Sequence, residues 1–124
     1  MGRVEDGTPY RWGGLFAALV ALRSLAKDGR IEEAPARVVT ATTSNPYNDC
    51  RGLLREIGHP LFDARERGGS AADAAVVIMG DIARLIPAGR EGRGTLTKAQ
   101  AEEFVQGYEA RFAEYRKAWG SLTG

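Results

Sequence analysis

The sequence predicts a mainly α-helical fold, an irregular bundle of three long helices joined by shorter ones. Two long segments carry apolar residues at steps of three and four, the spacing that places side chains on one side of a helix. Capping residues, glycines and prolines mark the ends of the predicted helices. Only residues 37–43 are rich in the β-branched side chains that favour strands, so at most one short strand is expected.

The composition is that of an ordinary folded protein, with 124 residues, of which 44% are hydrophobic and 27% charged. This length fits one domain, residues 1–124, with a core that needs no disulfide or structural metal. Seventeen basic and sixteen acidic residues give a net charge of +1, which provides no general attraction to nucleic acids or membranes. Such a partner would need a local patch.

Nothing in the sequence indicates export or membrane insertion. Residues 1–6 contain acids and lack the basic start and apolar run of a secretory signal. The longest apolar stretches, residues 15–22 and 74–79, are much shorter than the roughly 20 residues that cross a bilayer. We therefore expect a cytoplasmic protein without a membrane partner.

The first helix is predicted over residues 9–27. Thr8 can cap its free amides, Pro9 suits the first helical position, and Gly29 stops it. Arg23 falls on the apolar side, where we expect its aliphatic stem to cover apolar surface while the charged head reaches water. The apolar residues of this side are Trp12, Leu15, Phe16, Leu19, Val20, Leu22 and Ala26.

Residues 37–43 leave three interpretations open. A lone strand needs a partner, so this segment could pair with its copy in a second subunit, stay extended, or belong to a helix that starts at Pro35. Residues 44–49 have the composition of a turn, which ends any regular element there.

Three helices are predicted in the middle of the chain. Short helices are expected over residues 49–57, capped by Asp49, and over residues 60–67. Ser70 provides a capping signal for a longer helix that ends near Ile86 and is apolar on nearly all sides. We expect this middle helix to be the most buried, with the two aromatic helices against it; a buried strand over residues 74–79 is the alternative.

Residues 88–94 contain three glycines and predict a loop. Thr97 and Gln100 then form a capping box, which begins a helix that runs to about Trp119. Seven apolar residues of this helix fall within one arc of about 100°. They are Ala101, Phe104, Val105, Tyr108, Phe112, Tyr115 and Trp119.

Catalytic and metal chemistry find little support. Cys50 at a helix start, followed by His59 and Asp63, could be a thiol nucleophile, a base and an orienting acid, but they lie on separate local elements. We expect both Cys50 and His59 to be structural, and we expect no enzymatic activity and no cofactor. The acids are scattered, and Asp81 is expected to pair with Arg84 rather than bind a metal.

The first functional hypothesis is therefore a small protein–protein interaction or accessory module that self-associates. An aromatic surface larger than a small bundle needs for its core would mark its interface. The expected interface residues are Tyr108, Tyr115 and Trp119, and a homodimer is the commonest way to cover such a surface.

The alternative is a protein that binds nucleotide-like anions or nucleic acid. Arg90 and Arg93 stand between glycines, where backbone amides and guanidinium groups can meet an anion together. Asn45 and Tyr47 in the preceding turn would complete this site. A second arginine-rich stretch, residues 51–67, is neutralised by interspersed acids and is expected to be a solvated face.

Overall fold

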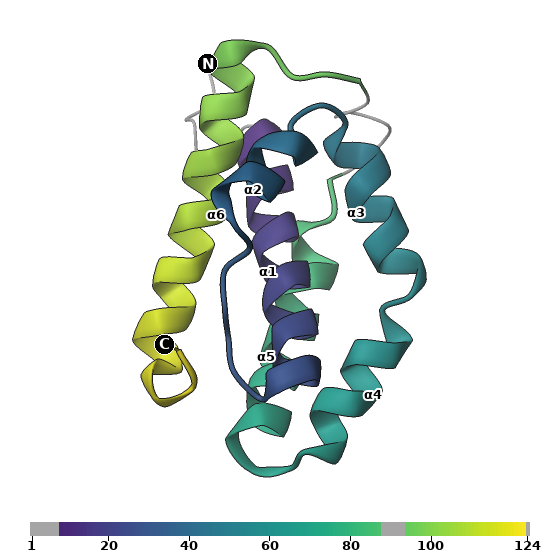
Figure 1. Cartoon of the computed structure of the whole chain (residues 1–124), viewed down its shortest axis with the longest axis vertical. Coiled ribbons are helices and arrows are strands. Elements are labelled where there is room, and N and C mark those ends of the chain that lie inside the picture. The colour runs from purple at the N-terminus through teal and green to yellow at the C-terminus, as the bar shows by residue number, and fades with distance from the viewer. Residues whose placement is uncertain (1–7, 88–93, 124) are drawn as a thin grey trace.

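The computed structural model describes residues 8–87 and 94–123, and this part of the chain contains six α-helices (Figure 1). The mainly helical fold predicted from the sequence is confirmed. A short 3-10 helix, η2, follows the last α-helix. The elements are α1 (Thr8–Asp28), α2 (Ala36–Thr42), α3 (Pro46–Arg55), α4 (Gly58–Glu66), α5 (Gly69–Leu85), α6 (Lys98–Ala118) and η2 (Gly120–Leu122).

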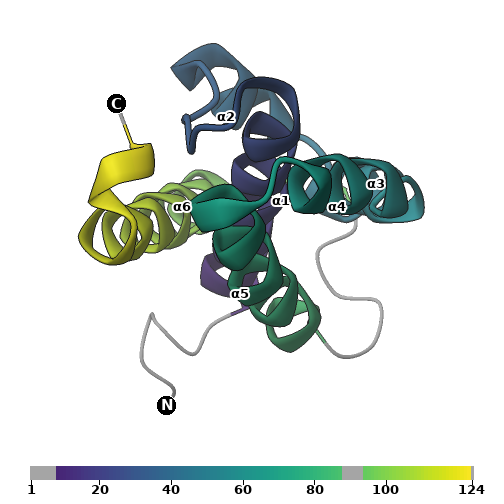
Figure 2. The ribbon, with the colours of Figure 1, turned by 90° about the horizontal axis from the view of Figure 1, so that it is seen from below.

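Helix α1 occupies the centre of the molecule. Figure 2 shows α6, α5 and the α3–α4 pair around three of its sides, with α2 near the fourth. Eleven of its residues are buried, and they point in every direction around the helix. Helix α1 is therefore the framework on which the other helices are arranged.

The prediction that α5 is the most buried helix is wrong. One side of α5, including the fully buried Ile78, packs on α1 and α4. The opposite side is open to solvent, and Val76 and Val77 are each 49% exposed. A helix that is apolar on all sides is fully buried only if other helices surround it. Helix α5 lies at the edge of the bundle, so one of its sides stays exposed.

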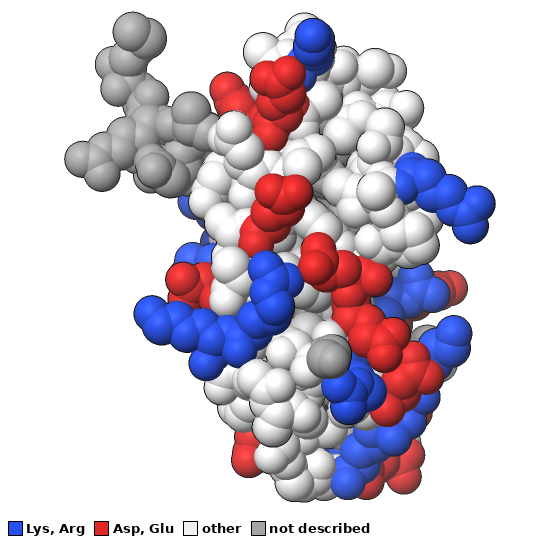
Figure 3. All heavy atoms as spheres, turned by 60° about the vertical axis from the view of Figure 1, so that its left-hand side comes forward, with Lys and Arg blue, Asp and Glu red and all other residues white. Residues whose placement is uncertain are grey.

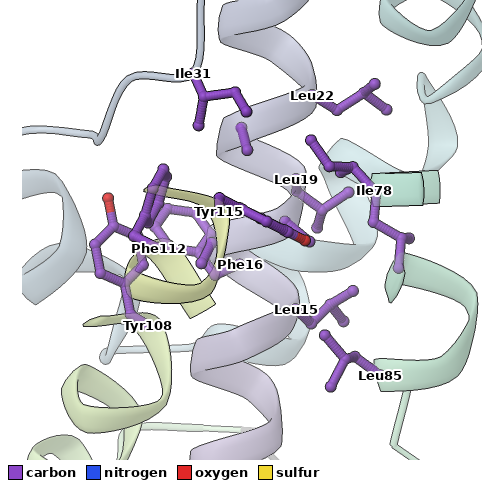
Figure 4. Packing of buried hydrophobic residues seen from close by; sticks show 14 of the residues in the cluster. Leu15, Phe16, Leu19, Leu22, Ile31, Ile78, Leu85, Tyr108, Phe112 and Tyr115 are labelled. Carbon is purple, nitrogen blue, oxygen red and sulfur yellow. The ribbon is translucent and has the colours of Figure 1, made fainter. Parts of the chain in front are cut away.

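Two glycines allow α1 and α6 to pack with their backbones in contact. A Cβ atom at Gly13 would overlap the carbonyl oxygen of Phe104, and one at Gly107 would overlap the carbonyl oxygen of Tyr10. Beside this contact, the ring of Phe16 packs on Phe104 with ring centroids 6.0 Å apart. It also packs on Tyr108 with centroids 5.9 Å apart (Figure 4). The aromatic residues of α6 thus form the core with α1.

Residues 37–42 belong to helix α2 and Thr43 is its C-cap, so the strand interpretation is wrong and the helix alternative is confirmed. The amides of Val38 and Val39 donate to the carbonyl oxygen of Pro35, which begins α2. Val39 and Thr42, three residues apart, are both buried. Burial of one side of the helix outweighs the strand preference of its β-branched residues.

The helix starts show where capping signals were interpreted correctly. The predicted capping box of Thr97 and Gln100 is present at the start of α6. Helix α3 begins three residues earlier than predicted, because Asn45 and not Asp49 caps it. Ser70 makes no cap hydrogen bond, and α5 follows Gly68, whose φ of 70° suits glycine.

Within the described residues, none of the helices combines the length and the apolar character needed to cross a lipid bilayer.

Replacing either contact glycine with alanine should destabilise the protein strongly. We expect Gly13→Ala and Gly107→Ala each to lower the free energy of unfolding by about 1–3 kcal/mol or more, because the new methyl group forces the helices apart. Urea denaturation followed by circular dichroism measures this. Gly80→Ala is the control: it lies inside α5 with open space at its Cβ position and should raise stability by up to about 1 kcal/mol. If Gly107→Ala had the same urea midpoint of unfolding as the wild type, the close packing of the two helices would be contradicted.

Candidate functional site

A groove of about 860 Å³ runs along the fourth side of α1. One wall is α3, and the other is formed by residues 32–35 of the connection between α1 and α2 together with Val38 and Thr42 of α2. We call this the α1–α3 groove. Its volume is in the range of sites that hold small molecules or short peptide segments.

The floor of the α1–α3 groove is apolar. Phe16 and Val20 contribute from α1, and Leu53 from α3. Val38 lines the groove and is 39% exposed, so it adds accessible apolar surface. A partner that covers this floor would gain hydrophobic stabilisation.

Hydrogen bonds fix the connection that contributes residues 32–35 to this wall. The amide of Glu32 donates to Oγ of Ser24 over 3.0 Å, which joins the wall to α1. The amide of Ala34 donates to the hydroxyl of Tyr108 over 2.8 Å, and the amide of Ile31 to the carbonyl oxygen of Leu122 over 2.9 Å. A connection without regular structure is thus held in place before any partner binds.

The rim of the α1–α3 groove is acidic. Arg23 and Lys27 contribute two positive charges against five carboxylates. In the described residues, only one of these carboxylates has an ion-pair partner: Glu33 lies 3.1 Å from Arg116. The remaining four could face a partner's cations. The five rim carboxylates are those of Asp28, Glu32, Glu33, Asp49 and Glu56.

The α6 side of the molecule carries charged side chains of both signs. Figure 3 brings the α6 side of the molecule forward, and acidic side chains run there from the top of the molecule to its middle. Basic side chains gather mainly below and beside them.

Asn45 and Tyr47, predicted to bind a ligand, have structural contacts at the start of α3. Oδ1 of Asn45 accepts the amide of Asn48 at 3.1 Å, which is the N-cap interaction. The ring of Tyr47 packs edge-on against Trp12 with centroids 5.9 Å apart. These contacts position α3 as a wall of the groove, and a ligand-binding role for the two residues stays a prediction.

Arg90 and Arg93, the other two predicted ligand-binding residues, lie outside the described residues. The structure therefore says nothing about the loop that carries them.

The three predicted interface residues belong to the monomer's own core. Tyr108 and Tyr115 are 3% and 2% exposed, and Trp119 is partly buried against the core. Residues on α1 cover the aromatic side of α6, so the exposed aromatic surface on which the prediction rested is missing from the described part of the chain. Self-association itself stays a prediction, without the surface first assigned to it.

Cys50 and His59 do not come together as nucleophile and base. The Cys50 side chain is fully buried, and burial, assisted by the nearby charge of Asp49, raises the pKa of its thiol. His59 is exposed and lines a smaller hollow of about 220 Å³ with Asp63. A buried thiol with a raised pKa forms little thiolate, so this chemistry has no reactive nucleophile.

Asp81 connects α5 with α6. Arg84 donates to its Oδ1 at 3.1 Å, which is the predicted pair, and the hydroxyl of Tyr115 donates to its Oδ2 at 2.9 Å. Asp73, on the same helix, is exposed. Within the described residues, no group of three or more His, Cys, Asp or Glu side chains is arranged to hold a metal ion.

The groove could not be recognised from the sequence. Its walls come from residues 16–28, 32–42 and 48–56, and no local motif links these segments. Arg23 gave the only hint. A charged head that reaches water on the apolar side of α1 requires that this side is partly open, and Arg23 is indeed exposed at the groove.

Comparison with known proteins gives no relative: no family model, curated protein or solved structure matches the chain significantly.

The burial of Cys50 predicts an unreactive thiol. In the folded protein, we expect a disulfide exchange reagent such as dithiobis(nitrobenzoate) to label Cys50 only as fast as the chain unfolds, and labelling should be rapid in urea. Ser44→Cys in a Cys50→Ala background is the control, because residue 44 is exposed and should react at once. Rapid labelling of native Cys50 would contradict its burial.

Tyr108 should make the protein less stable at high pH. Burial raises the pKa of its hydroxyl to about 12; the hydrogen bond from the amide of Ala34 opposes this shift, and the nearby charge of Glu33 adds a smaller increase. Because this pKa is higher in the folded state than in the unfolded state, the stabilisation is complete below about pH 10 and is lost as the pH rises toward 12. The free energy of unfolding, measured by urea denaturation between about pH 9 and about pH 11.5, reports this loss. Tyr108→Phe should reduce the slope, and Tyr115, whose pKa burial also raises, should account for the remainder; an unchanged slope in Tyr108→Phe would contradict the assignment.

Proposed function

We propose that the protein is a non-enzymatic interaction module that binds a basic, amphipathic segment of a partner protein in the α1–α3 groove. One observation carries this proposal: a preformed groove with an apolar floor has five carboxylates and only two cations on its rim. Apolar anchors give a partner affinity, and opposite charges around them select and orient it.

The dimensions favour a short helix as the bound segment. The groove extends along α1 from Phe16 to Lys27, a distance of about 16 Å at the rise of an α-helix. Two to three turns of an amphipathic helix cover about that length, with apolar residues on one side and basic residues along the edges. The hydrogen bonds of Glu32 and Ala34 fix one wall beforehand, which lowers the entropic cost of binding.

A synthetic peptide tests the proposal. The probe is a helix of about 14 residues with leucine at every third or fourth position and lysine elsewhere, and its binding is followed by fluorescence anisotropy. The matched peptide has glutamate in place of lysine. We expect only the lysine peptide to bind, and we expect its affinity to fall as salt is added.

Charge reversal at the rim separates the groove from the overall charge of the protein. Glu32→Lys/Glu56→Lys should weaken binding of the lysine peptide by about tenfold or more, because within the described residues neither of these exposed carboxylates has an ion pair to lose. Glu66→Lys/Asp73→Lys changes the net charge equally, away from the groove, and should bind almost as the wild type does. Equal effects of the two double variants would overturn the proposal. A mass that doubles with protein concentration and is reduced by Glu32→Lys/Glu56→Lys would also overturn it, by placing a second copy in the groove.

A further inference from the structure

A second site lies on the other side of α1, where the first turns of α1 meet the end of α5 and the second half of α6. A pocket of about 460 Å³ opens there, with Gly14 and Gly107 at its base and the guanidinium groups of Arg11, Arg84 and Arg111 around it. Glu114 is the only carboxylate among the residues that line it. We call this the arginine pocket. It shares no lining residue with the α1–α3 groove.

The three guanidinium groups have too few acceptors among the described residues. Nη2 of Arg11 donates to the carbonyl oxygen of Arg84 over 2.8 Å, which ties α1 to the end of α5. Asp81 already accepts from Arg84 and from Tyr115, and Nη1 of Arg111 lies 3.7 Å away from its Oδ2. One carboxylate is thus shared between two arginines and a tyrosine.

Arg111 shows the deficit most clearly. Its Nε is buried and has no hydrogen-bond partner within the described residues. A buried donor without an acceptor is rare in folded proteins, and such a group calls for an explanation. The guanidinium group lies 5.8 Å from the ring centroid of Tyr115, a cation–π arrangement that holds it in place. This contact and the approach to Asp81 therefore position the guanidinium group of Arg111 beside the pocket before a ligand arrives.

The balance of charge favours an anion. Three positive groups face the negative charges of Asp81 and Glu114, which leaves an excess positive charge on a protein that is almost neutral overall. Planar guanidinium groups match the paired oxygens of phosphate and carboxylate groups. The volume leaves room for an organic group besides the anionic one.

We propose that the arginine pocket binds a small organic oxyanion, whose oxygens accept hydrogen bonds from Arg84 and Arg111. Phosphate and carboxylate groups share this chemistry. Arg111, whose side chain is 22% exposed and lies against the ring of Tyr115, supplies a prepositioned donor, and Arg84, whose side chain is 59% exposed, supplies a second donor from α5. This binding is independent of the α1–α3 groove, so the peptide experiment can fail while this one succeeds.

Isothermal titration calorimetry with defined probes tests the pocket. The probes are adenosine monophosphate, inorganic phosphate and citrate, so that phosphate-bearing and carboxylate-bearing ligands are compared directly. Binding of either class at low salt supports the proposal and identifies the oxyanion. Absence of binding by every probe overturns it.

Variants assign any binding to this pocket. Arg111→Gln and Arg84→Gln should each weaken binding by about tenfold or more. Because the side chain of Arg84 is exposed, we expect Arg84→Gln to fold as the wild type does. Lys117→Gln removes the same charge from an exposed position on α6 and should leave the affinity within about twofold. Glu114→Gln should strengthen binding, because it removes the carboxylate that faces the ligand. A purely structural role for the arginines would not produce this gain, and an unchanged affinity in Arg84→Gln and Arg111→Gln would overturn the proposal.

Discussion

The contact between the backbones of α1 and α6 determines the rest of the structure. Gly13 and Gly107 bring the helices together until no side-chain atom fits between them at these points. At this spacing the aromatic residues of α6 reach across the surface of α1, and Phe112 packs between Tyr108 and Tyr115 with ring centroids 5.0 and 6.2 Å apart. The aromatic side chains are therefore buried in a small protein. The glycines form the point of closest approach, and the aromatic side chains pack next to it.

Both proposed sites follow from the central position of α1. Three sides of this helix are covered by other helices, and the fourth is covered only in part, which produces the α1–α3 groove. The arginine pocket lies where the glycine contact ends and Arg11 reaches the last turn of α5. Each site is lined by side chains of α1, so a change in the packing of α1 affects both.

The sequence predicted most of the helices because their signals are local. The capping box at Thr97 and the periodic aromatic residues of α6 identified that helix without reference to the remainder of the chain. Local signals also explain the errors. Residues 37–43 have strand preferences that only the burial of Val39 and Thr42 overrides, and the cap at Asn45 competes with an equally plausible one at Asp49.

The arrangement of the helices was harder to predict, since apolar surface shows that a helix needs a partner but not which one. The aromatic side of α6 was interpreted as partly exposed because the role of Gly13 depends on its contact with residue 104, far away in the sequence. The same applies to the candidate sites. Asp81 was correctly paired with Arg84 three residues away, whereas its contacts with Arg111 and Tyr115 depend on how α5 and α6 are both placed against α1.

The long separation between α1 and α6 also affects how the chain folds as it is synthesised. The central helix leaves the ribosome early, and its largest partner, which begins at Lys98, follows only after four other helices. Until then, apolar residues such as Phe16 lack the surface that buries them in the finished protein. The glycine contact is a nonlocal one, and contacts of this kind slow folding and prolong the exposure of aggregation-prone intermediates. The tight packing that stabilises the finished protein therefore leaves the nascent chain dependent on the synthesis of α6.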